Sequence, residues 1–126
     1  MVPDDLRYTK EHEWIRVEGD EAVIGITQYA ADQLGDIVFV ELPDAGRALE
    51  QAATFGVVES VKAVSDLFAP VSGEVTAGND NLGGTPEVVN TDPYGEGWLV
   101  RVRLADASEL DSLLDAAAYE QLIAEG

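Results

Sequence analysis

Short runs of alternating apolar and polar residues cover much of the chain, and turn residues separate them. In residues 13–26, "EWIRVEGDEAVIGI", two alternating runs meet at Gly19 and Asp20, which is typical of a β-hairpin. Such alternation places every second side chain on the same face of a strand. Further strands are predicted over residues 37–42, 54–60, 66–77 and 97–104.

The last of these runs shows the clearest separation of two faces. In "GWLVRVRL" the apolar Val100 and Val102 alternate with the charged Arg101 and Arg103. A strand with this pattern buries one face and leaves the other in water. We therefore expect the two valines on one face of the strand and the two arginines on the other.

Two segments have helical rather than strand-like spacing. Thr27 is a good N-cap for a short helix over residues 28–34, "QYAADQL", and Gly35 follows directly as a helix terminator. After Asp106 the apolar residues recur at helical intervals, with a break expected near Asp115. The apolar positions of this tail are Leu110, Leu113, Leu114, Tyr119, Leu122 and Ile123.

The remaining stretch, residues 78–97, is dense in Gly, Asn, Asp and Pro and is predicted to be a loop. No linker, repeat or low-complexity segment divides the chain. We therefore predict one mainly-β domain over residues 1–126, a β-sandwich or flattened barrel with a short helix near residues 28–34 and a helical C-terminus.

The charge balance limits the partners of the chain. The 126 residues include 25 acidic and 7 basic residues, for a formal net charge of −18. Such a surface repels nucleic acids and anionic membranes and suits partners with basic patches, although it is equally explained as an adaptation to salt or for solubility. With no signal or transit peptide in the pattern, we expect a cytoplasmic protein. No strongly apolar exposed face can be identified, so a monomer is expected.

The chain is poorly supplied with catalytic side chains. It has no cysteine, which excludes thiolate nucleophiles and thiolate metal sites, and a Ser-His-Asp triad would have to use its one histidine, His12. We expect His12 at the surface and Trp14 packed in the interior. These observations favour a protein that is not itself an enzyme and has no metal site.

One of the two lysines occupies a notable position. In "ESVKAVSD", Lys62 lies in a bend between two β-forming runs, with Glu59 three residues before it and Asp66 four residues after it. An amine at the tip of a hairpin is accessible to a modifying enzyme, and the two carboxylates could help that enzyme to recognise the turn. On spacing alone, a solvated turn lysine is the commoner explanation of the pattern.

Several segments together resemble one known family. "YTKEHEWIRVEGDEAVIGIT", "LGDIVFVELPDAG", "FGVVESVKAVSDLFAPVSGEV" and "NTDPYGEGWLVRV" resemble, in order, the motifs of the glycine cleavage system H proteins, over about residues 8–102. The resemblance implies a barrel-sandwich hybrid fold of the biotinyl/lipoyl carrier type. It also implies that lipoic acid is attached in amide linkage to Lys62.

The resemblance further implies a shuttle function. In this family the P protein, a pyridoxal-phosphate glycine decarboxylase, passes an aminomethyl group to the lipoyl arm of the H protein. The T protein, an aminomethyltransferase, takes the one-carbon unit, and the L protein, a dihydrolipoamide dehydrogenase, removes the electrons. A lipoyl or octanoyl transferase or a lipoate ligase attaches the arm. The H protein is the carrier subunit on which these enzymes act.

The family also implies where the loaded arm rests. Matching positions here include Glu13, which could hold the cationic amine of the cargo, and the segment 28–34. A solvated strand carboxylate is an equally good interpretation of Glu13. Gln33 stands where some members have a histidine, so an amide replaces the imidazole. Ala52 stands near a turn where carriers often have glycine, so that turn could differ in shape.

Two alternatives to the shuttle remain open. The chain could be a relay that passes lipoyl groups from Lys62 to other carriers, or an unmodified interaction protein with the same fold. A biotin carrier is disfavoured because Val61 and Ala63 flank the lysine, where biotin-accepting turns usually have methionine.

Overall fold

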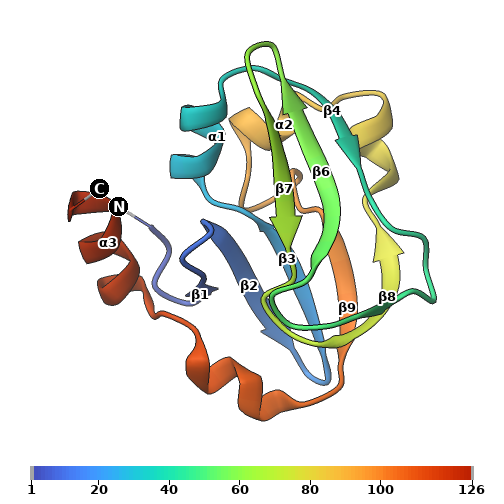
Figure 1. Ribbon diagram of the computed structural model, residues 1–126, viewed down its shortest axis with the longest axis vertical. Coiled ribbons are helices and arrows are strands. Elements are labelled where there is room, and N and C mark those ends of the chain that lie inside the picture. Colours follow the sequence, from blue (N-terminus) through green and yellow to red (C-terminus); the bar gives the residue numbers. More distant parts are fainter. Residues whose placement is uncertain (1, 126) are drawn as a thin grey trace.

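The protein is built from two antiparallel β-sheets, as Figure 1 shows for the computed structural model, which describes residues 2–125. This confirms the mainly-β prediction. The larger sheet has the order β1-β2-β3-β9-β8-β5, and the smaller sheet has the order β4-β6-β7. The strands of the larger sheet are Arg7–Tyr8 (β1), Glu13–Glu18 (β2), Glu21–Ile26 (β3), Val100–Leu104 (β9), Gly73–Gly78 (β8) and Ala48–Leu49 (β5). Those of the smaller sheet are Ile37–Glu41 (β4), Thr54–Ser60 (β6) and Val64–Phe68 (β7).

The predicted short helix is present, with both of its predicted ends. The hydroxyl of Thr27 accepts a hydrogen bond from the Ala30 N–H, 3.2 Å away, and the Gly35 N–H donates to the Ala31 carbonyl at 3.0 Å. The helical segments are Gln28–Leu34 (α1), Asp80–Gly83 (η1), Val88–Thr91 (α2), Ala107–Ser112 (η2) and Ala116–Glu125 (α3). Among residues 2–125, no helix is long and apolar enough to cross a membrane.

The main core lies between the two sheets. Val100 and Val102 on β9 are fully buried, while Arg101 and Arg103 lie outside, as the alternation predicted. From the smaller sheet, Phe55, Val58 and Leu67 face the same core. Burying a side chain of this size stabilises the fold by roughly 1.5–3 kcal/mol, so the core holds the smaller sheet in place over the larger one.

A second core fixes the C-terminal tail. Tyr119 of α3 stacks on Tyr8 of β1, with ring centroids 4.7 Å apart, and Leu6, Trp14 and Val23 complete the buried part of this cluster. The tail breaks between η2 and α3, close to the predicted position at Asp115. Packing against β1 and β2 thus draws the C-terminus back to the start of the chain (Figure 1).

The predicted strand over residues 66–77 is in fact two strands in different sheets. β7 ends at Phe68, and β8 begins at Gly73. Pro70 has no N–H for a sheet hydrogen bond, so a continuous strand is interrupted there. The Ala69 N–H instead donates to the Ala53 carbonyl at 2.8 Å, and the chain crosses from one sheet to the other.

The predicted loop over residues 78–97 contains two single-turn helical segments, η1 and α2. Asn79 starts η1 by accepting a hydrogen bond from the Asn81 N–H through its side chain. The two-residue strands β1 and β5 are too short to produce a period-2 pattern, so sequence alternation could not reveal them. Ala52 has a left-handed backbone, with φ of 73°, a conformation that glycine adopts more readily than alanine.

Candidate functional site

Lys62 lies in the turn of the β6–β7 hairpin, and its side chain is exposed. Ser60 closes this turn. The Ser60 N–H donates to the Ala63 carbonyl at 2.8 Å, and its hydroxyl oxygen accepts from the N–H groups of Ala63 at 3.0 Å and of Lys62 at 3.3 Å. These bonds hold the backbone on both sides of the lysine, so its amine is presented from a defined loop.

The hairpin tip also rests on the segment that links α1 to β4. The Val61 N–H donates to the Asp36 carbonyl at 3.0 Å. Next to it, the Cε atom of Lys62 lies 3.4 Å from the point where a Cβ on Gly35 would stand. In Figure 1 the β6–β7 turn extends to the same end of the molecule as α1. The tip is therefore supported from one side and open on the other.

The two predicted carboxylates near Lys62 lie on the hairpin itself. Glu59 is half-buried on β6 and pairs with Val64 across the hairpin. Asp66 is exposed on β7 and borders a shallow depression together with Glu41 and Arg47. Asp66 pairs with Val57, so one cross-strand row, Val58 with Ser65, separates it from the row of Glu59.

Gln33 is exposed near the end of α1, the helix that Gly35 terminates beside the lysine. The structure therefore places Gln33 on the same side of the hairpin tip as the contact between Lys62 and Gly35. It lies on a different element from the four other predicted residues.

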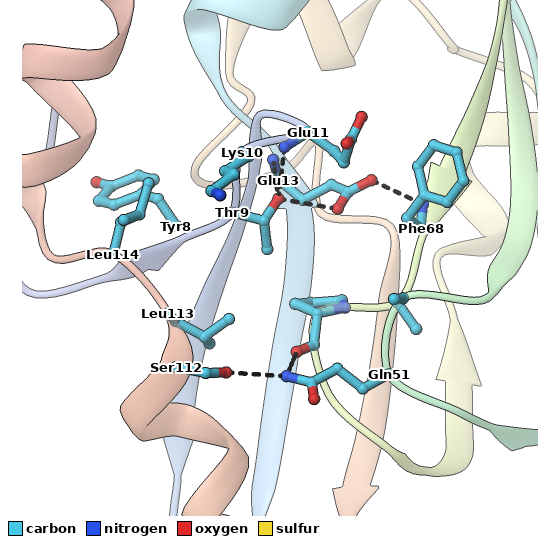
Figure 2. Close-up of a pocket in the computed structure, with 13 residues that line it drawn as sticks. Tyr8, Thr9, Lys10, Glu11, Glu13, Gln51, Phe68, Ser112, Leu113 and Leu114 are labelled. Atoms are coloured by element: carbon cyan, nitrogen blue, oxygen red, sulfur yellow. Dashed lines mark hydrogen bonds between the residues drawn. The ribbon is translucent and has the colours of Figure 1, made fainter.

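Glu13 is buried, so its interpretation as a solvated strand carboxylate is wrong. Only 2% of the residue is exposed. One carboxylate oxygen accepts a hydrogen bond from the Phe68 N–H at 2.7 Å, and the other accepts from the Thr9 hydroxyl at 3.1 Å (Figure 2). Glu13 thus supplies an acceptor for an N–H at the end of β7, an edge strand of the smaller sheet.

Burial changes the acidity of this carboxyl. Removal from water raises the pKa of Glu13 to about 8, against the opposing effect of the hydrogen bonds from Phe68 and Thr9. Near neutral pH the carboxyl is therefore largely uncharged. A cation brought next to it would reverse this balance, because an adjacent positive charge favours the carboxylate.

Glu13 lines a pocket of about 370 Å³. Its walls come from four separate parts of the chain: the β1–β2 connection, the turn before β6, the end of β7 and the segment after η2 (Figure 2). The residues include Thr9, Lys10, Gln51, Phe68 and Leu113. Sequence reasoning missed these residues because no motif joins segments so far apart in the chain.

His12 is not the surface residue that we expected. It is half-buried, and its Nδ1 lies 2.8 Å from the Tyr119 hydroxyl, which in turn lies 2.7 Å from the Thr27 hydroxyl. Burial lowers the pKa of His12. Through these contacts α3 is connected to the N-cap of α1, so the C-terminal tail supports the helix next to the hairpin.

Comparison with known proteins finds one family along almost the whole chain. The family model described as Glycine cleavage H-protein matches residues 6–126. The glycine cleavage system H protein of Symbiobacterium thermophilum is 60% identical over 99% of this chain and 98% of its own. That of Halorhodospira halophila is 58% identical over 99% of this chain and 97% of its own.

The fold agrees with a solved relative as well. The crystal structure of a glycine cleavage system H protein from Mycobacterium marinum superimposes with a TM-score of 0.90 at 40% identity, covering 98% of this chain and 99% of that chain. Two sheets, a helical tail and an exposed hairpin lysine thus accompany full-length sequence similarity. This chain belongs to the glycine cleavage system H protein family.

Proposed function

We propose that this protein is the lipoylated carrier of a glycine cleavage system, with the lipoyl group in amide linkage on Lys62. It receives an aminomethyl group at the P protein and delivers it to the T protein. It then passes electrons to the L protein. The single observation that carries the proposal is the exposed Lys62 at the closed turn of the β6–β7 hairpin in a chain of this family.

The surroundings of Lys62 fit a covalently attached group. A primary amine on a flexible side chain is the chemistry that amide formation needs, and the turn leaves it exposed. When bound, the lipoyl group supplies a disulfide that takes up the cargo and two electrons, which a chain without cysteine does not have. The backbone hydrogen bonds of Ser60 hold the attachment point, so mobility is confined to the arm.

Glu13 fits the role of holding a cationic amine. A buried carboxylate accepts a charge-assisted hydrogen bond strongly, because little water competes for it. Before a cation arrives, the raised pKa keeps the group largely neutral and avoids an unpaired buried charge. Pairing with an amine would then release one proton and leave the carboxylate in its charged form.

The exposed carboxylates suit a carrier that visits several enzymes. A net charge of −18 steers the protein toward basic docking surfaces and speeds encounter. Attachment of the arm on one hairpin raises the effective concentration of the carried group at each enzyme in turn. We propose that the protein acts as a monomer in this cycle.

Two measurements test the proposed function. Intact and tryptic mass spectrometry of the protein from its native host should find one lipoyl increment, located on Lys62. Reconstitution of the lipoylated protein with purified P, T and L proteins should then support decarboxylation of glycine. An unmodified Lys62 in cells that lipoylate other carriers would contradict the proposal. A lipoylated protein that supports no decarboxylation would indicate the relay function instead.

A further inference from the structure

Exposed apolar side chains gather around Lys62. Among residues 2–125, five large hydrophobic side chains are strongly exposed, and four of them belong to the hairpin or to the strand beside it. These four residues form the hairpin patch: Val38 (52% exposed), Phe39 (50%), Val61 (69%) and Val64 (66%). Single exposed apolar residues are common, but a group of them on one surface usually marks an interaction site.

The backbone of the smaller sheet brings these residues together. Phe39 on β4 pairs with Glu59 on β6, which pairs with Val64 on β7. Residues paired directly across antiparallel strands point to the same face, so Phe39 and Val64 flank Glu59 in one row. Val61 is in the turn, next to Lys62.

An irregularity in β4 leaves Val38 exposed next to Phe39. The pairing of β4 with β6 shifts between Ile37 and Phe39. This shift inserts one extra residue, and such a bulge re-aims side chains. Val38 and Phe39 are consecutive and would face opposite sides of a regular strand, yet both are exposed. The bulge thus places two large apolar side chains in water beside the hairpin.

The patch has an acidic border. Asp36, Glu41 and Asp66 are exposed around it, and Glu59 lies within it. Between residues 48 and 100, Lys62 is the sole basic residue of the sequence. The charge pattern is therefore an apolar centre with a negative rim and one amine. A partner surface complementary to this pattern would be an apolar depression with a basic rim.

We propose that the hairpin patch is the docking surface for the enzyme that acylates Lys62, an acyltransferase whose active-site entrance is apolar and rimmed by basic residues. This inference rests on the proposed function, since it names the partner that acts on the attachment site. The patch, rather than the amine alone, then selects Lys62 over Lys10.

The chemistry of acylation explains why this partner, among several, must cover the patch. The Lys62 nitrogen attacks the carbonyl carbon of an activated lipoyl or octanoyl donor. A C–N bond forms, the bond from the carbonyl to the activating group breaks, and that group leaves with the electron pair. The nitrogen loses a proton to a base of the enzyme. This enzyme must bring its reacting atoms to Nζ itself, so its surface lies directly on the turn.

Enzymes that act on the far end of the attached chain have no such requirement. Their reacting atoms meet the distal sulfurs, at a distance from the turn set by the length of the chain. The patch lies on the hairpin that carries Lys62 and on the strand beside it, and has no comparable relation to the distal end. Removal of its apolar groups should therefore slow attachment more than it slows the later reactions.

The test compares Phe39→Ser and Val64→Ser with Val17→Ser. Val17 is 44% exposed and lies on β2 near the β2–β3 turn, which is at the opposite end of the molecule from the β6–β7 turn (Figure 1). Each unmodified variant is incubated with a purified lipoate ligase or octanoyltransferase and its activated donor, and the product is followed by intact mass spectrometry. We expect kcat/KM for acylation to fall roughly tenfold in the two patch variants, because serine loses the gain from removing the Phe39 or Val64 side chain from water on docking. Val17→Ser should match the wild type.

Three control readouts separate docking from other effects. Acetic anhydride, which needs no protein surface, should modify Lys62 at the same rate in all variants, and thermal unfolding should show intact folds. Variants that carry the lipoyl group on every Lys62 should support glycine decarboxylation at close to the wild-type rate. An equal loss in decarboxylation would overturn the assignment to the acyltransferase, as would equal acylation rates for Phe39→Ser, Val64→Ser and Val17→Ser. If the wild type is not acylated at Lys62 at all, the proposed function itself fails and the inference fails with it.

Discussion

The Lys62 side chain rests on Gly35 at the end of α1. Its Cε atom is 3.4 Å from the position that a Cβ on Gly35 would occupy. Gly35 has φ of 83° and ψ of −160°, a region that is essentially restricted to glycine. The glycine therefore ends the helix and also leaves space for the stem of the lysine.

Gly35→Ala should destabilise the protein. The backbone conformation costs an L-residue about 1–3 kcal/mol, while the new methyl group would make an ordinary contact with the Lys62 stem. Urea unfolding gives the free energy of unfolding, and amide hydrogen exchange at the end of α1 reports local loosening. Gly83→Ala is the matched control, since Gly83 lacks a positive φ and has open space around its Cα. Equal stability of the two variants would contradict the role of Gly35.

Lys62→Arg should abolish attachment of the lipoyl group and leave the fold intact. The guanidinium stays protonated and is a poor nucleophile, while an exposed turn side chain contributes little to stability, within about 0.5 kcal/mol. Mass spectrometry after incubation with a lipoate ligase, together with thermal unfolding, checks both parts. A loss of cooperative unfolding would show that Lys62 has a structural role.

Glu13→Gln should change how stability depends on pH. The pKa of Glu13 is about 8 in the folded protein, above its ordinary value of 4.5, so the folded state holds a proton that the unfolded state loses. The contribution of protonated Glu13 to the free energy of unfolding is complete below about pH 4.5. It is lost as the pH rises toward 8, at up to about 1.4 kcal/mol per pH unit. Glutamine retains an acceptor for the Phe68 N–H and removes this titration.

Urea unfolding of the wild type and Glu13→Gln at several pH values between 5 and 8 measures the difference. The stability of the wild type should fall relative to the variant across this range. Glu50→Gln, at an exposed position, controls for the loss of one carboxyl. Parallel stability curves for the wild type and Glu13→Gln would show that burial of Glu13 has no such energetic effect.

Glu13→Ala should shorten the time for which the carrier retains an amine cargo. The variant removes the buried carboxylate that is proposed to pair with the cationic amine, so water reaches the cargo more easily. Attachment of the lipoyl group should be unchanged, because Lys62 lies at the other end of β7. The rate of ammonia and formaldehyde release from the loaded carrier, without T protein, measures retention. An unchanged rate would remove Glu13 from the site.

Ala52→Gly should stabilise the protein. Ala52 has φ of 73°, where an L-residue with a Cβ is strained. Glycine relieves the strain, and the expected gain is about 0.5–1 kcal/mol after the larger entropy of the unfolded chain is included. Thermal unfolding should show a higher midpoint. Ala53→Gly at the neighbouring exposed position should lower it, since no positive φ is relieved there.

Local patterns predicted what depends on neighbouring residues. Thr27 and Gly35 mark the ends of α1 because their capping groups act within one turn, and the position of Lys62 follows from two β-forming runs with a short connection. The faces of β9 follow from strict alternation at Val100 to Arg103. The full set of family motifs led to the H protein family for the same reason, since each motif is a contiguous stretch.

The tertiary structure decided what depends on distant segments. Alternation gave no indication that Glu13 would be buried, because its partners Thr9 and Phe68 come from different elements and the N–H of an edge strand required an acceptor. The single predicted strand after Lys62 became two because Pro70 interrupts the sheet and the core has two layers. The sequence thus determined the family, the hairpin and the lysine in its turn. Packing between the two sheets determined the environment of Glu13 and the apolar surface around Lys62, since burial is set by all elements together.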